Sequence, residues 1–383
     1  MANTLNLGNG NWATKEDSLL AYNSENGNFK PLPFDFTRAS SATVVNKAGL
    51  IETVGSGEAR IDFSNDAKGA LLLEPQRSNL FYYSEDFNNW SKSGWTLTSG
   101  LLAPNGNLDA YSVLRTTGST FAQSLTLSSN TTYTFSAYIK NVNATNIQLR
   151  VQNQAGNTSG TESNCIVFSV TDQTSTSNFT RITHTFNTGD AGSYGLFLGY
   201  YSAGEYIVWG AQLEQGSYAT SYIPTQGSAV TRVAETCNNA GNNQVINSTE
   251  GVLYVDIKND INQQQTISLR QGTTDSVQLG FINGGIRIVV GSNNVDVVKT
   301  LSPNFTYSNG IYNKYAVVWN GTNVKTFING VLRDTTLTSS PLGLSSLGFD
   351  NPYLAEKIAG DVQDVRVYNT ALTDAELISL TTI

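Results

Sequence analysis

The chain has 383 residues, enough for two or three domains that each bury a core. Charged residues make up 14% of it and the formal net charge is −8, which argues against binding to a nucleic-acid backbone, because that requires a basic face. No stretch of about 18 consecutive apolar residues occurs, and the N-terminus lacks the basic start and apolar core of a signal peptide. We therefore expect no membrane insertion and no secretion through a signal sequence.

Residues 1–33 contain few apolar side chains. An arm of this composition cannot bury enough surface to fold alone. Two arrangements remain open: the arm docks on another protein or twines with its own copies, or it folds back on its own domain. The first is preferred, which makes the apolar side chains of the arm candidate attachment residues. These are Leu5, Leu7, Trp12, Leu19 and Leu20.

Residues 34–79 contain three short strand candidates, at 41–45, 50–54 and 70–73. The first two are joined by Asn46-Lys47-Ala48-Gly49, in which glycine supplies the positive φ that a tight turn needs. The third ends at Glu74-Pro75, since proline removes a ladder donor. An isolated hairpin is marginal in water. We therefore expect this β-hairpin region to be an adaptor that lies against a neighbouring domain or another subunit.

Alternation of apolar and polar residues dominates residues 80–224. One predicted strand places four apolar side chains on one face, and shorter strands repeat the pattern. The face residues are Tyr133, Phe135, Ala137 and Ile139 in the first strand, then Ile147, Leu149 and Val151, and then Ile182, His184 and Phe186. Many short alternating strands separated by Gly/Asn turns predict a β-sandwich. Residues 225–243 show no periodicity and are predicted to be a linker.

Residues 244–383 carry the clearest hairpin signals. Asn283-Gly284, Asn320-Gly321 and Asn329-Gly330 each lie between alternating strands, as expected for type I′ turns, whose two central residues need φ > 0. Thr373 and Glu376 form a capping-box pattern that opens a short helix. The predicted fold is all-β: two β-sandwich (jelly-roll) domains in tandem, at 80–224 and 244–383, behind an N-terminal arm and a β-hairpin region.

Several phrases of the sequence resemble known families. FDFTRASSATVVNKAGLIETV, RIDF, LLLEPQRSNL and GAQLEQGSYATSYIPTQGSAVTR resemble a module of structural proteins of tailed bacteriophages, including crAss-like phages of Bacteroidota. NLFYYSEDFNNWSKSGW and YTFSAYIK resemble jelly-roll carbohydrate-binding modules. KYAVVWNGTNVKTFINGVLRD and IAGDVQDVRVYNTALTDAEL are similar to laminin-G/concanavalin-A-like jelly rolls, an architecture that hosts lectins, hydrolases and inert spacers alike.

The phage resemblance implies a non-enzymatic head fibre or tail-fibre-like appendage at the virion surface. Its partners would be its own copies, with a homotrimer expected from fibre proteins, and capsid or tail proteins contacted through the N-terminal region. Weak contacts to host surface polysaccharide would gain avidity from repetition on one particle. Two alternatives stay open: a glycan-binding adhesion or lectin module, and a polysaccharide depolymerase.

The residues that could carry catalysis or bind metal give little support for either. His184 is the one histidine and is read as a half-buried strand residue, and two cysteines, Cys165 and Cys237, cannot form a metal site or a disulfide framework. Jelly rolls of both families often hold a structural calcium, but no dense DxDxD run is present, so we name no metal ligand and expect no cofactor.

Carboxylate pairs are the remaining catalytic candidates, since a glycosidase needs two carboxyl groups on either side of a cleft. The pairs are Glu85/Asp86, Asp361/Asp364 and Asp374/Glu376. The last pair is already explained by helix capping, and residues 244–383 lack the closely spaced glutamates of concanavalin-like glycosidases. We therefore expect no enzyme.

Sugar binding is favoured by the aromatic content, because sugar faces stack on exposed Trp and Tyr and the chain has 5 Trp and 18 Tyr. Packing in the core or at a subunit interface is the competing role for each of them, and the preferred one for any single residue. The glycan-binding candidates are Trp90, Trp95, Tyr200, Tyr201 and Trp209.

Overall fold

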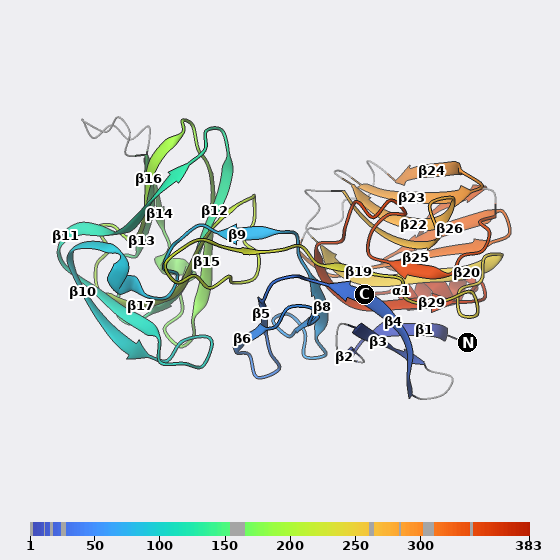
Figure 1. The fold of residues 1–383 in the computed structure, drawn as a ribbon, viewed down its shortest axis with the longest axis horizontal. Coiled ribbons are helices and arrows are strands. Elements are labelled where there is room, and N and C mark those ends of the chain that lie inside the picture. Colours follow the sequence, from blue (N-terminus) through green and yellow to red (C-terminus); the bar gives the residue numbers. More distant parts are fainter. Residues whose placement is uncertain are drawn as a thin grey trace. The chain divides into compact units, whose positions relative to one another are not determined.

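A computed structural model describes residues 3–10, 12–15, 18–23, 28–153, 165–259, 264–282, 285–301, 310–337 and 340–383. The described chain is nearly all β-structure, and its one α-helix is α1 (Asp374–Thr381) (Figure 1). It divides into two units. Unit 1 is Met1–Gly49, Thr53–Pro75 and Val233–Ile383, and unit 2 is Leu50–Glu52 and Gln76–Arg232. The predicted all-β fold with more than one sandwich is confirmed, and in sequence unit 2 is an insertion within unit 1.

Unit 1 is built from two sheets. The larger has the strand order β19 (Thr236–Asn238), β4 (Asn28–Thr37), β3 (Ser18–Asn23), β1 (Asn3–Gly8), β29 (Gly360–Tyr368), β20 (Glu250–Asn259), β25 (Asn313–Asn320), β26 (Asn323–Ile328) and β27 (Val331–Leu337). Strand β2 (Ala13–Lys15) pairs with β3, β7 (Arg60–Asp62) pairs with β8 (Ala70–Leu73), and β8 pairs with β29. The smaller sheet has the order β24 (Val295–Leu301), β23 (Gly285–Ser292), β22 (Asp275–Ile282), β21 (Gln265–Gln271) and β28 (Ser346–Gly348).

The core of unit 1 draws on both ends of the chain. Leu253 and Val255 of β20, Ile267 of β21 and Leu279 of β22 pack in one cluster with Leu71 of β8. Helix α1 covers a second, smaller apolar cluster, and it begins at the predicted capping box, in which Thr373 and Glu376 bind each other's backbone N–H. The predicted strand 70–73 is β8, and its pairing with β29 makes the β-hairpin region an integral part of this unit.

The N-terminal arm folds back on its own domain, which is the arrangement that the sequence placed second. Strand β1 pairs with β29, and Leu5 and Leu7 are buried in the unit 1 core. Trp12 packs against the same core, while Leu19 and Leu20 lie in β3, where only the backbone is described. The arm is too poor in apolar residues to fold alone, but as an added strand its two leucines complete an existing core. Leu5 and Leu7 are therefore not available to a partner.

The hairpin turns follow the predicted positions more closely than the predicted geometry. Asn329 and Gly330 have φ of 49° and 78°, as a type I′ turn requires. At the second site β25 and β26 close at Asn320 and Asn323, so the loop is residues 321–322, and only Gly321 has a positive φ. The prediction of Asn320 as a central turn residue is wrong. The Asn283-Gly284 turn lies outside the described residues.

Unit 2 is an eight-stranded assembly with the order β14 (Cys165–Ser169), β13 (Gln148–Asn153), β16 (Gly192–Gly199), β11 (Ala110–Leu127), β17 (Glu205–Gln215), β12 (Thr132–Asn141) and β15 (Thr180–Asn187), and with β10 (Ser91–Leu101) paired to β11. Strand β9 (Arg77–Asn79) pairs with β18 (Val230–Arg232) in a separate two-stranded sheet of unit 2, and β5 (Ala42–Val45) pairs with β6 (Ile51–Val54) in a further two-stranded sheet of the chain. The predicted alternation holds in β12, where Tyr133, Phe135, Ala137 and Ile139 are all buried.

The segment at residues 225–243, which the sequence predicts to be a linker, is ordered, and most of it forms part of the two units. It contributes β18 and β19, and Cys237 and Ala240 are buried, with the Cys237 thiol free. Its polar composition hid this role because several of its buried groups are charged or hydrogen-bonded.

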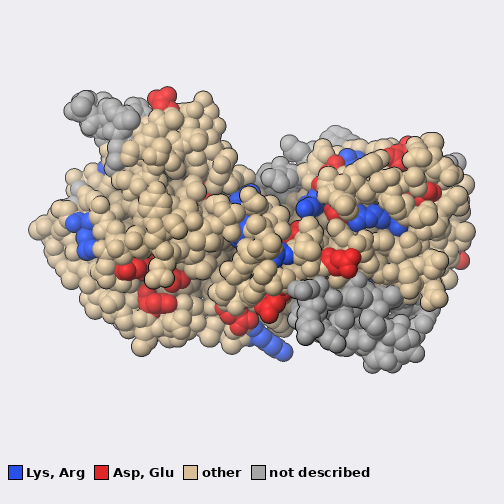
Figure 2. Space-filling view, viewed as in Figure 1, with Lys and Arg blue, Asp and Glu red and all other residues tan. Residues whose placement is uncertain are grey.

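On the face drawn in Figure 2, small groups of Lys and Arg lie among Asp and Glu, and most of the described surface is uncharged.

Candidate functional site

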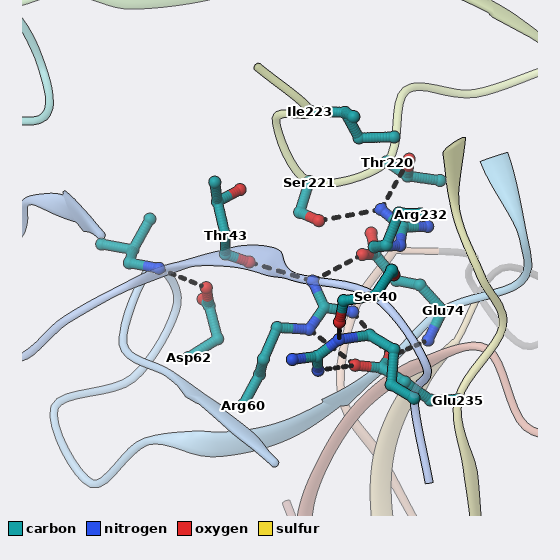
Figure 3. Close-up of polar contacts among 12 residues, drawn as sticks. Ser40, Thr43, Arg60, Asp62, Glu74, Thr220, Ser221, Ile223, Arg232 and Glu235 are labelled. Atoms are coloured by element: carbon teal, nitrogen blue, oxygen red, sulfur yellow. Dashed lines mark hydrogen bonds and ion pairs between the residues drawn. The ribbon is translucent and has the colours of Figure 1, made fainter. Parts of the chain in front are cut away.

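Four charged side chains of unit 1 form a buried group, here called the arginine–glutamate cluster: Arg38, Arg60, Glu74 and Glu235 (Figure 3). Arg60 reaches both carboxylates, with Nη2 at 2.6 Å from Glu235 Oε2 and Nη1 at 2.8 Å from Glu74 Oε2. Arg38 Nη1 donates to Glu235 Oε1 at 2.9 Å. The remaining donors also find acceptors, for example Arg60 Nη1 at 3.0 Å from the Thr43 carbonyl.

The ion pairs of this cluster stabilise the fold of unit 1. Two arginines balance two glutamates, and every residue is in hydrogen-bonding contact, which is the condition for burying charge without a large loss of stability. Burial alone would lower the pKa of Arg60, but Glu235 and Glu74 raise it above its ordinary value, so it remains a cation. The phrases TRASS, RIDF, LLLEP and TRVAE each supply one of the four residues.

The three tryptophan candidates do not present a binding face. Trp90 and Trp95 are buried in the unit 2 core, where Trp90 packs on Phe81 and Phe121 at ring distances of 4.9 and 5.7 Å. Trp209 is also buried, with its ring 4.6 Å from that of Tyr222. Their position is the packing role, which the sequence analysis preferred for any single aromatic residue.

Tyr200 and Tyr201 differ from the tryptophans because they gather with two arginines at the end of β16. The group is called here the tyrosine–arginine platform (Arg115, Arg150, Tyr200 and Tyr201). The two tyrosine rings meet edge to face at 4.4 Å. Arg150 lies 3.9 Å from the Tyr200 ring centre, and Arg115 lies 5.0 Å from that of Tyr201. Such contacts between cations and aromatic faces hold the rings in fixed orientations.

Tyr201 is the exposed member of the platform. Its accessible fraction is 53%, and its φ of 52° places it in the left-handed region that a residue with a bulky side chain rarely adopts. Residues held in such backbone conformations cluster at functional sites, which makes Tyr201 a candidate binding residue. The backbone is pinned on both sides, since the Tyr200 N–H donates to the Gln148 carbonyl at 3.2 Å and Asn146 Nδ2 donates to the Tyr201 carbonyl at 3.3 Å.

The sequence did not single out the two arginines of this platform. Arg150 stands between the core residues Leu149 and Val151 of β13, so alternation puts it on the opposite face of the sheet. It pairs across the ladder with Phe197 of β16 and lies 5.7 Å from that ring. Charged residues are few in this chain, so an arginine at an outward-facing strand position is the sequence signal that could have identified Arg150.

The remaining predicted chemistry-bearing residues have structural partners. His184 stacks on Phe168 at 3.9 Å, and burial lowers its pKa. The carboxylate pairs are likewise engaged: Glu85 with Tyr222, Asp86 with Tyr111, Asp361 with Asn65 and Lys258, Asp364 with Arg366, Asp374 with Lys325, and Glu376 with Thr373. Within the described chain, no group of three or more His, Cys, Asp or Glu side chains is placed to hold a metal ion. No helix of that part of the chain is long and apolar enough to cross a membrane.

Part of unit 1 matches the model of a known fold family. Residues 252–378 match the family model described as the concanavalin A-like lectin/glucanases superfamily. No curated protein matches the chain. The jelly-roll, concanavalin-like character predicted for 244–383 is thereby confirmed as a statement about fold.

Solved structures similar to parts of the chain include the following three. The carbohydrate-binding module CBM40 of a Ruminococcus gnavus sialidase, bound to sialyllactose, is 18% identical over 37% of this chain and 86% of that one, with a TM-score of 0.31. Domain 4 of the Geobacillus stearothermophilus arabinanase AbnA is 14% identical over 44% and 84%, with a TM-score of 0.33. A pentraxin of Limulus polyphemus is 15% identical over 35% and 70%, with a TM-score of 0.30. These values are too low to carry an argument about function.

Proposed function

We propose that the protein binds glycans without catalysing their cleavage, and that the tyrosine–arginine platform of unit 2 is the binding surface. The observation that carries the proposal is Tyr201: an aromatic side chain that is 53% exposed, has a left-handed backbone and is flanked by Arg115. A rigid aromatic face that is fixed before binding costs little conformational entropy when a sugar ring stacks on it.

The two arginines favour a particular kind of sugar. Guanidinium groups recognise carboxylates and similar oxyanions through paired, charge-assisted hydrogen bonds. Arg150 Nε is a buried donor without a hydrogen-bond partner, and it lies beside the Tyr200 ring. An oligosaccharide that contains an acidic sugar would match a stacking surface bordered by cations, so the proposed ligand class is an acidic glycan.

A glycan array with the full chain tests the proposal. We expect binding to acidic oligosaccharides, a loss of at least about tenfold in affinity for Tyr201→Ala, and no change for Tyr82→Ala, which alters another tyrosine of unit 2 that is 45% exposed. Incubation of the bound glycan with the protein should release no new reducing ends. An array without any bound glycan would refute glycan binding, and new reducing ends lost on substitution of one carboxylate would refute the non-enzymatic part.

A second proposal concerns where the protein works. The resemblance of the phrases around Arg38, Arg60 and Glu74 to tailed-phage structural proteins supports a virion appendage, a head fibre or tail-fibre-like component assembled as a homo-oligomer. Attachment would use a surface other than Leu5 and Leu7, because both are buried. Cryo-EM of the assembled particle tests this proposal, and a particle that lacks the protein would contradict it.

A further inference from the structure

The outer face of the larger sheet in unit 1 contains a cavity of about 500 Å3 between strands β20, β25 and β29 and the C-terminal residues of the chain. The ladder aligns its polar residues in two rows. Asp256 of β20 pairs with Lys314 of β25 on one side and with Asp364 of β29 on the other. In the next outward-facing row Tyr254 pairs with Arg366. Because alternate residues of β20, such as Leu253 and Val255, fill the core, these side chains line the opposite face.

Two polar atoms in this lining have no hydrogen-bond partner. Asp256 is 6% exposed, and its Oδ1 is buried without a donor. The Tyr312 hydroxyl, which lines the same cavity, is also buried and unpartnered. Buried polar groups are almost always hydrogen-bonded to protein or ordered water in folded proteins, so two such groups on residues that line one cavity leave hydrogen-bonding capacity that a ligand can use.

The charged neighbours of Asp256 are held by other groups. Lys314 Nζ donates to the Thr382 carbonyl at 2.9 Å, and Arg366 Nη2 donates to Asp364 Oδ2 at 2.6 Å. Arg366 also lies over the Tyr254 ring, with its Cζ 5.4 Å from the ring centre. These interactions direct both cationic groups to partners other than Asp256.

The mixed lining selects against a charged ligand. An anion would meet Asp256 and Asp364, and a cation would meet Lys314 and Arg366. A hydroxyl group can donate to the Asp256 oxygen and can accept from the Tyr312 hydroxyl, because it is both donor and acceptor. A volume of this size lies within the range of small-molecule pockets. We propose that the cavity is a second binding site, specific for a neutral, hydroxyl-rich ligand such as a sugar ring or polyol.

The inference is independent of the platform in unit 2, since all of the residues used here belong to unit 1. The two sites also differ in ligand class, because the platform is expected to prefer acidic sugars. Substitutions at the two sites can therefore be tested separately in the full chain.

Saturation-transfer NMR on the full chain provides the test, with glucose, galactose, mannose and fucose as neutral probes and glucuronate and glucosamine as charged ones. The binding is measured in the full chain carrying Tyr201→Ala, so that the platform does not contribute. At least one neutral sugar should bind at millimolar concentration, with neither charged probe binding more tightly. Asp256→Asn should weaken that binding about tenfold, because a charge-assisted hydrogen bond is lost, and Tyr312→Phe should weaken it severalfold. The matched control is Asp296→Asn, the same chemical change at an exposed residue of β24.

Thermal melting separates these effects from unfolding. Tyr312→Phe removes an unpartnered hydroxyl and Asp256→Asn removes a buried charge, so at pH 7.5 the melting temperatures of both variants should equal or exceed that of the wild type. A lower melting temperature for Tyr312→Phe would show that the hydroxyl has a structural partner and would overturn the premise. Absence of any neutral-sugar binding, or binding that Tyr201→Ala abolishes and Asp256→Asn leaves intact, would overturn the inference while leaving the proposed function standing.

Discussion

Arg60 and Glu235 lie 175 residues apart in the sequence and form a two-point ion pair, in which Nε donates to Oε1 at 2.7 Å and Nη2 donates to Oε2 at 2.6 Å. Both side chains are fully shielded from solvent. The pair links β7, in the N-terminal part of unit 1, to the segment that leads into β19. It ties together two segments of unit 1 that are far apart in the sequence.

Arg60→Met should destabilise unit 1 by about 3–5 kcal/mol, because it leaves Glu235 and Glu74 buried with only Arg38 to balance them. Arg60→Lys should rescue little of this loss, since an ammonium group cannot reproduce the paired geometry. Urea denaturation monitored by fluorescence measures the effect. Lys325→Ala, which removes a surface ion pair to Asp374, is the control and should cost under about 1 kcal/mol. A similar small cost for Arg60→Met would contradict the role given to the cluster.

Leu7→Ala should cost about 2–5 kcal/mol of stability if the N-terminal arm is part of the unit 1 core. Leu7 is fully buried on β1, and its Cα partner in the ladder is Val365 of β29. An arm that serves as a free attachment segment would give an unchanged denaturation midpoint. The exposed Val295 of β24 offers the control Val295→Ala, for which we expect almost no change.

Asp256 should make unit 1 less stable as the pH rises. Burial raises the pKa of Asp256 from its ordinary 3.8 to about 6; Lys314 opposes this rise and Asp364 adds to it. The folded state therefore holds the proton longer than the unfolded chain, and stability falls between about pH 4 and 6 and stays low above that. At about 1.4 kcal/mol per pKa unit, the loss is up to about 3 kcal/mol.

Asp256→Asn should remove this part of the pH dependence, so the variant should gain stability over the wild type at pH 7.5 and lose the advantage at pH 4. Burial also raises the pKa of Asp361 to about 6, so the wild-type slope contains both carboxyl groups and the variant should retain the share of Asp361. Denaturation curves at several pH values measure the difference. Parallel pH profiles for variant and wild type would show that Asp256 ionises normally.

Tyr201→Gly should separate folding from binding. Glycine adopts the left-handed region without strain, so a Tyr201 φ of 52° predicts a gain of roughly 1 kcal/mol on relief of the strain, before the lost contacts with Tyr200 and Arg115 are subtracted. The melting temperature should therefore change little while glycan affinity is lost. A large drop in melting temperature would show that Tyr201 is a packing residue.

The strands were largely predictable because alternation reports burial directly. The face of β12 follows from side chains that are apolar at every second position, and the limits of β8 follow from a continuous apolar run that ends at Glu74-Pro75. The capping box at Thr373 was equally predictable, because it depends on two residues that lie three positions apart in the sequence. Turn geometry was less predictable. Asn293 and Asn294, with φ of 51° and 65°, form a turn between β23 and β24, and neither position has the glycine that signals such a turn.

Features that depend on distant parts of the chain were not predictable from local pattern. The residues near Glu235 give no indication that its partners are Arg38 and Arg60. Until those partners are known, a polar segment without periodicity is interpreted as a linker. The same limit applies to the candidate sites. Aromatic content named Tyr200 and Tyr201 together with three buried tryptophans, because a sequence gives the residue type and not its exposure.

The most direct test of the central claim, that the tyrosine–arginine platform binds glycan, is a backbone-amide NMR titration of the full chain with an acidic oligosaccharide identified on the array. We expect saturable shifts of the backbone-amide resonances of Tyr200, Tyr201 and Arg150, and these shifts should disappear in Tyr201→Gly. Shifts confined to other residues, or an unchanged titration in that variant, would contradict it.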